Sequence, residues 1–214
     1  SGPSTHIVNT VSNLLTQLTQ IPEHLIAAGI GSTRAAAAKL AKQQRVADNI
    51  LLSEVGARAF GMMEGTKEGL LAFGKVMRTG DPTDPLTKIE ARRHKAIPGM
   101  AGSVIRTPTR LLMAEDEFFK ATARRSALAG LAVRTARNEG VRGAAAKARI
   151  AELVASPTDD MLQQSFDYAR YLTFQSPLGS FGQKLSGATE AVPPLKLVIP
   201  FIRTPINLFK YSLE

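Results

Sequence analysis

The chain has 214 residues, 44% of them hydrophobic and only 6% aromatic, and it contains neither tryptophan nor cysteine. The lack of cysteine excludes disulfides, thiolate metal sites and cysteine nucleophiles. Lysine and arginine outnumber aspartate and glutamate by 27 to 18, and the excess lies in residues 86–150, where the counts are 14 and 5. We therefore expect any polyanion to meet the middle of the chain first.

Scarce β-branched alternation and abundant alanine predict an all-α fold whose helices pack through small residues. We expect an elongated multi-helix assembly with irregular connections rich in proline and glycine. The predicted segments are long N-terminal helices over 1–80, a basic irregular linker over 81–106, a basic helical segment over 107–155, and a helix, an adaptable loop and a closing helix over 156–214. The chain starts without methionine and stops in mid-pattern, so we expect a segment of a longer protein.

The first predicted helix is capped by Ser4 or Thr5 and is amphipathic. Its apolar side carries Ile7, Val11, Leu14, Leu15, Leu18 and Ile21, and its opposite side carries Asn9, Asn13, Gln17 and Gln20. Pro22 is expected to interrupt this helix, and Gly29 and Gly31 to stop the turns that follow.

A long alanine-rich helix is predicted next, opened by Ser32 or Thr33 and running from about Arg34 past Leu52 to about Arg78. Glycine recurs within it every four or five residues, at Gly56, Gly61, Gly65, Gly69 and Gly74. Each glycine costs about 1 kcal/mol relative to alanine in a helix. Two interpretations stay open: another helix approaches closely on this side, as at interfaces of small residues, or the helix is frayed or broken.

The clearest break is the Gly-Asp-Pro-Thr-Asp-Pro sequence of residues 80–85. Two nearly identical motifs follow, Ile105-Arg106-Thr107-Pro108 and Ile202-Arg203-Thr204-Pro205. In each motif we expect the threonine to cap a helix by accepting a backbone hydrogen bond and the proline to suit the first helical turn. Thr107, Pro108, Thr204 and Pro205 are therefore predicted to be critical for folding.

Three further helices are predicted between these motifs, over residues 108 to about 138, roughly 141–154, and directly after Ser156-Pro157. Glu139-Gly140 is expected to end the first, and Ser156-Pro157 to cap the third. Residues 175–194 are rich in serine, glycine and proline, and we expect an extended loop there.

The polar residues do not form a catalytic pattern. His6, His24 and His94 are scattered, without a second ligand at metal spacing. Helix-dipole balance and i,i+4 pairing explain the acidic Glu115-Asp116-Glu117 stretch better than catalysis does. The Gly29-to-Thr33 stretch lacks the Gly-Lys-Ser/Thr ending of a phosphate-binding loop. We expect no catalytic residue, no metal site, no cofactor and no enzymatic activity.

Basic side chains in the middle of the chain are candidate polyanion contacts. The set is Arg92, Arg93, Lys95, Arg124, Arg125, Arg134, Arg137 and Arg142. On helical spacing they surround the helix, and no aromatic residue lies between Phe119 and Phe166 to stack on single strands. Loose contact with DNA, with anionic lipid or with acidic neighbouring subunits stays open, beside a simple solvated face.

The stretch Ser1-Gly2-Pro3-Ser4-Thr5-His6-Ile7-Val8-Asn9-Thr10-Val11-Ser12-Asn13 and the stretch Ile199-Pro200-Phe201-Ile202-Arg203-Thr204-Pro205-Ile206-Asn207 together resemble a known family. They are similar to a region of the large internal virion proteins, or DNA-ejection proteins, of short-tailed bacteriophages and of related large polyvalent phage proteins. The order and separation of the two stretches fit that family.

This resemblance implies a structural function. The chain would belong to a much longer protein that is packed in the virion interior near the portal. On infection, the protein would be expelled into the host cell envelope (periplasm and inner membrane) to help form a conduit for the genome. The implied partners are further copies of the chain, other virion and ejection proteins, DNA through non-specific contact, and host membrane.

Two other functions stay open. The chain could be a basic module that binds DNA non-specifically by itself. Alternatively, residues 5–28 and 195–213 could form amphipathic helices that interact with membranes.

Overall fold

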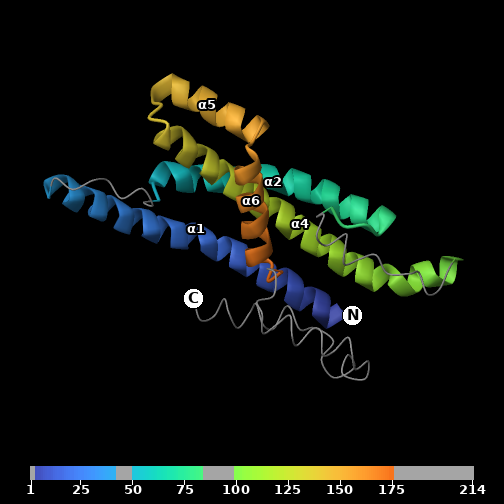
Figure 1. Cartoon of the computed structure of the whole chain (residues 1–214). Helices are drawn as coiled ribbons and strands as arrows, with labels where there is room; N and C mark the ends of the chain where they lie inside the picture. The colour runs from blue at the N-terminus through green and yellow to red at the C-terminus, as the bar shows by residue number, and fades with distance from the viewer. Residues whose placement is uncertain (1–2, 42–49, 84–98, 176–214) are drawn as a thin grey trace, which may run out of the picture. The chain divides into compact units, whose positions relative to one another are not determined.

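The computed structural model describes residues 3–41, 50–83 and 99–175 (Figure 1). The regular elements of these residues are the helices α1 (Pro3–Leu40), α2 (Leu52–Thr79), α4 (Gly99–Asn138), α5 (Gly143–Ala155) and α6 (Asp159–Leu172). The prediction of an all-α fold is confirmed. The chain divides into a unit of residues 1–169 and a unit of residues 170–214, and the contacts between helices described below lie within the first. The predicted Thr204–Pro205 helix start, the candidates Arg92, Arg93 and Lys95, and His94 lie outside the described residues.

Helix α1 is continuous, so the predicted interruption at Pro22 and the predicted stop at Gly29 and Gly31 are wrong. Pro22 removes one i→i−4 hydrogen bond from the helix without ending it. Ser32 and Thr33, which were predicted to open a new helix, lie inside α1 instead. Ser32 Oγ donates to the carbonyl of Gly29 at 2.7 Å, and Thr33 Oγ1 donates to the carbonyl of Ile30 at 2.8 Å. Such back-bonding is a common way to hold serine and threonine inside a helix.

The predicted long helix from Arg34 to Arg78 is divided in two. Helix α1 ends at Leu40, and α2 starts at Leu52, directly after Leu51 in an extended conformation with φ −107° and ψ 156°. The predicted end is nearly right, because α2 stops at Thr79. Gly80 adopts a left-handed φ of 74° there, and its N–H donates to the carbonyl of Val76.

Helices α2 and α4 pack side by side and antiparallel over most of α2 (Figure 1). Three glycines of α2 face the backbone of α4. An added Cβ would lie 2.6 Å from the carbonyl oxygen of Arg125 at Gly61, 2.9 Å from Cα of Thr122 at Gly65, and 2.9 Å from the carbonyl oxygen of Phe118 at Gly69. Only glycine permits this approach, so the close-packing interpretation is confirmed for these positions.

Helix α4 also carries a row of buried alanines, each no more than 2% exposed: Ala114, Ala123, Ala127, Ala132 and Ala136. Ser126 and Ala129 of α4 lie opposite Gly61, so small residues of both helices make this interface, as the composition predicted. Gly56 and Gly74 differ from the other α2 glycines, because an added Cβ would meet nothing within 4 Å at either position.

Helix α4 begins at Gly99, and this corrects two predictions. Thr107 and Pro108 lie inside the helix, so Thr107 is not an N-cap, and the linker predicted over 81–106 is helical from residue 99 onwards. Proline is disfavoured in a helix interior by about 3 kcal/mol. We attribute its tolerance here to the packing of the rest of α4 against α2.

The end of α4 agrees with the predicted stop at Glu139-Gly140. Gly140 has a φ of 76°, and the N–H of Val141 donates to the carbonyl of Ala136, as in a Schellman motif. Helix α5 then packs on α4 around a cluster that comprises Leu128, Ala132, Leu153 and Met161.

The cap of α6 differs from the prediction. Ser156 ends α5, and Thr158 starts α6, because the Met161 N–H donates to Thr158 Oγ1 at 3.3 Å. Asp159 and Asp160 form the acidic first turn that the sequence predicted.

Candidate interaction surface

The apolar side of α1 faces outwards. We call it the apolar face of α1; its members are 46% to 65% exposed and comprise Ile7, Val8, Val11, Leu14, Leu15, Leu18, Leu25, Ile26 and Ile30. An amphipathic helix normally turns this side towards the core. Contiguous exposed apolar patches of this kind mark interaction surfaces.

The amide side of α1 faces inwards instead. Asn13, Gln17 and Gln20 are all buried. Gln17 Nε2 donates to the carbonyl of Phe119 in α4 at 2.7 Å, and the Tyr168 hydroxyl of α6 donates to Gln20 Oε1 at 2.9 Å. Neutral amides suit this position, because they can pair with backbone and hydroxyl groups without the desolvation penalty of a charge.

The start of α1 is held in a similar way. The carboxylate of Glu115 in α4 lies 3.2 Å from His6 Nδ1 and accepts a 3.4 Å hydrogen bond from Asn9 Nδ2. Helix α1 is therefore bound to the rest of its unit through polar contacts spread over several turns, and its apolar face is left free of them.

Sequence reasoning missed this orientation, although a signal was present. Between residues 7 and 30 the chain contains no lysine or arginine, and Glu23 is the only carboxylate. A solvent-facing helix side normally carries charges. A stripe of asparagine and glutamine without charges is what a buried, hydrogen-bonded side requires.

A buried ionic cluster joins α2 to α4. Glu54, which is fully buried, accepts hydrogen bonds from Arg58 at 3.2 Å and from Arg134 at 2.8 Å. The Arg58 guanidinium also lies 5.4 Å from the ring centroid of Tyr168. Among the described residues, no group accepts a hydrogen bond from Nη1 of Arg58, which is buried.

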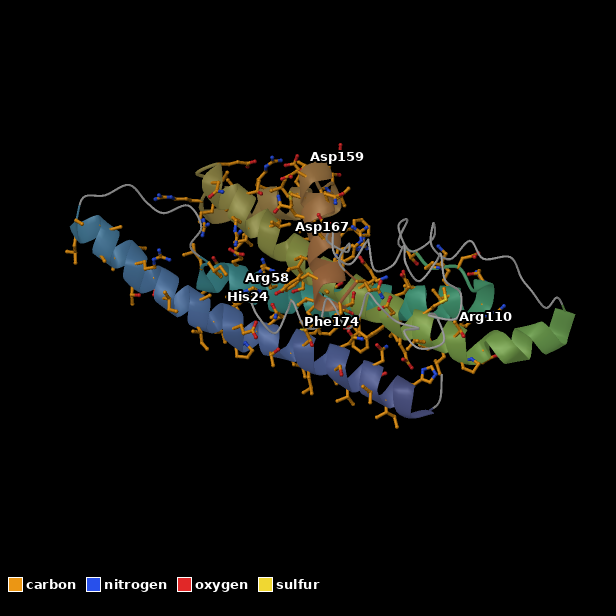
Figure 2. All side chains as sticks on the ribbon, turned by 60° about the horizontal axis from the view of Figure 1, so that its bottom comes forward. His24, Arg58, Arg110, Asp159, Asp167 and Phe174 are labelled. Atoms are coloured by element: carbon orange, nitrogen blue, oxygen red, sulfur yellow. The ribbon has the colours of Figure 1, made fainter. Side chains whose placement is uncertain are left out.

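His24 of α1 borders this cluster, and Figure 2 shows His24 and Arg58 close together. Its Nε2 lies 3.3 Å from the Tyr168 hydroxyl. Burial and then the positive charge of Arg58 lower the pKa of His24 below its ordinary value of 6.5, while Glu54 acts in the opposite direction. His24 therefore lies uncharged beside the cluster at neutral pH.

Three of the candidate polyanion contacts have partners within the fold. Arg124 and Arg125 pair with Glu68 of α2 at 3.0 and 3.5 Å, and Arg134 pairs with Glu54. Arg137, partly buried, also takes part in an interaction within the structure. Arg142 is exposed at the start of α5. Three arginines of α4 thus hold α2.

The acidic stretch in α4 is divided among different partners. Lys120 pairs with Asp116 at 2.9 Å, four residues away as predicted, and with Glu117 at 3.4 Å. Glu117 also accepts the backbone N–H of Thr83, and Glu115 points to α1. Within the described part of the chain, no three histidine, aspartate or glutamate side chains converge on a metal position.

An apolar groove of about 300 Å³ lies between α2, α4 and α5. Its lining includes Phe60, Ala129, Ile150 and Val154, with Glu64 and Lys147 also contributing. The lining surface is almost wholly apolar, so the groove offers packing contacts. None of the described helices is long and apolar enough to cross a membrane.

No protein-family model, curated protein or solved structure matches this chain.

Proposed function

We propose that the chain is a structural component of a phage internal virion or genome-ejection apparatus, packing as helical subunits near the portal or in a conduit across the envelope. The outward apolar face of α1 carries this proposal, because a face of this size is maintained where another surface covers it. The resemblance at the two ends of the sequence supplies the phage context.

Other features support an assembly function. Several polar groups that the sequence singled out are engaged in helix-to-helix contacts: Arg134 with Glu54, Arg124 with Glu68, and Glu115 with α1. Small residues make the α2–α4 interface compact and leave α1 to present its apolar face. Copies of the chain and other virion proteins are the partners that we propose.

Fractionation of phage particles tests this function. Antibodies against the chain should detect its parent polypeptide in purified, DNA-filled particles and should no longer detect it in particles that have ejected their genome. The major capsid protein, retained in both fractions, is the control. A parent polypeptide that is absent from purified particles would contradict the proposal.

Non-specific DNA binding is proposed as an accessory property, based on the net charge of +9. Binding of the isolated chain to duplex DNA should then weaken steeply as salt rises. Absence of binding at low salt would remove this property and leave the structural function standing.

A further inference from the structure

The apolar face of α1 has a repeat suited to pairing with a helix of the same kind. Val11, Leu18 and Leu25 follow one another at seven-residue intervals, and Ile7 and Leu14 form a second series with the same interval. All five side chains are 46% to 64% exposed. The second series continues with Ile21, which is half-buried, and ends at Ala28, which is buried. Over residues 7–25 the two series have the spacing of a coiled-coil seam, in which side chains of one helix fit between those of its partner.

The charge distribution favours a protein over a lipid surface. Helices that lie on membranes combine an apolar side with lysine and arginine on the polar side. From Ile7 onwards, the first lysine or arginine of α1 is Arg34. The polar side of α1 is already bound to α4 through Gln17 and to α6 through Gln20. The face itself is uncharged, so two copies can meet without electrostatic repulsion.

We infer that the apolar face of α1 pairs with the same face of a second copy of this chain, in an antiparallel arrangement about a two-fold axis near Leu18. This inference rests on the proposed assembly function and names one partner and its contact surface. Leu18 lies midway between Ile7 and Ile30, the ends of the face. The face runs over 23 residues of helix, about 35 Å, along which two copies can make contact.

The antiparallel direction follows from the charges at the end of α1. Arg34 and Lys39 are exposed near its C-terminus. A parallel pair would place these cations beside their counterparts, whereas an antiparallel pair separates them and aligns the two helix dipoles favourably.

Sedimentation of the full 214-residue chain tests the surface. Leu18→Glu should raise the dimer dissociation constant about thirtyfold or more, because it places two carboxylates at the centre of the interface. Leu71→Glu is the matched control, since Leu71 is an exposed leucine of α2 (76%) away from the face, and it should leave the dissociation constant unchanged. Unchanged helical circular dichroism and denaturation midpoints verify that both variants fold.

Several outcomes would overturn the inference. A Leu18→Glu variant that associates like the unchanged chain would assign self-association to another surface, while the proposed assembly function would survive. A chain that is monomeric at all concentrations would remove the second copy, and the particle fractionation would still decide the proposed function. A monomer that floats with uncharged phosphatidylcholine vesicles, and loses this property in Leu18→Glu, would show lipid to be the occupant.

Cross-linking tests the direction, and the absence of cysteine makes each introduced thiol unique. Leu18→Cys should form a disulfide with its own counterpart on oxidation. Ile7→Cys alone should not, because 23 residues of helix would separate one residue 7 from the position opposite the other, about 35 Å. An equal mixture of Ile7→Cys and Ile30→Cys should cross-link. Efficient self-cross-linking of Ile7→Cys would overturn the antiparallel arrangement.

Discussion

Gln17 in α1 donates a 2.7 Å hydrogen bond to the backbone carbonyl oxygen of Phe119 in α4, and both side chains are buried. Gln17→Ala should lower the free energy of unfolding by about 1 kcal/mol, the usual net contribution of such a bond. Gln17→Glu should lower it further, because a carboxylate would face the carbonyl oxygen. Chemical denaturation measures both. Gln163→Ala, which removes an exposed amide of α6, should change it by less than about 0.5 kcal/mol.

The glycines of α2 divide into two groups with opposite responses to substitution. Gly65→Ala should destabilise the fold by about 1–3 kcal/mol, because its Cβ would meet the backbone of Thr122 at 2.9 Å. Gly74→Ala should stabilise it by up to about 1 kcal/mol, since alanine is the better helix former and the site is open. Thermal unfolding of the two variants gives the comparison. Destabilisation by both, to the same degree, would contradict the role given to Gly65.

The fully buried carboxylate of Glu54 balances two arginines. Glu54→Ala should cost about 3–5 kcal/mol, because Arg58 would remain buried without its counter-charge. Glu64→Ala is the control. Its partner Lys67 is largely exposed, so the expected change is less than about 1 kcal/mol. If urea titrations gave equal losses of unfolding free energy for Glu54→Ala and Glu64→Ala, the large contribution assigned to the buried cluster would be refuted.

His24 should make the fold less stable in mild acid. Its pKa is lowered in the folded chain, so below about pH 6.5 the unfolded chain binds a proton that the folded chain does not. Stability from this group is complete above pH 6.5 and declines as the pH falls through 6.5 towards the folded pKa. His24→Gln should reduce the difference in unfolding free energy between pH 7.5 and pH 5.5. His6 is present in both proteins, so the comparison isolates His24.

The sequence was informative about helix content and about which side of α2 carries its glycines. Small residues at four-residue spacing have few physical explanations, and close helix contact is the one that the structure adopts at Gly61, Gly65 and Gly69. The stop at Gly140 was also predictable, because glycine readily adopts the positive φ found there.

Helix boundaries and the orientation of α1 were less accessible. Pro22 and Pro108 are local signals against a helix, and packing elsewhere in each helix overrides them. Periodicity identifies the apolar side of α1, but it does not state whether that side meets the core of the same chain or something else. The inward orientation of Gln17 depends on its hydrogen bond to a carbonyl that is 102 residues away in the sequence. No local sequence pattern contains this contact.

The even spacing of Gly61, Gly65 and Gly69 leaves an ambiguity that the fold must resolve. Sliding α2 by four residues, about 6 Å, would place two of the three glycines again in glycine positions opposite α4, so the contact by itself tolerates more than one alignment. Two ion pairs, Glu54 with Arg134 near the start of α2 and Glu68 with Arg124 near its middle, would both be broken by that displacement. These charges therefore select one alignment among near-equivalent ones, much as a single polar pair fixes the register of a coiled coil.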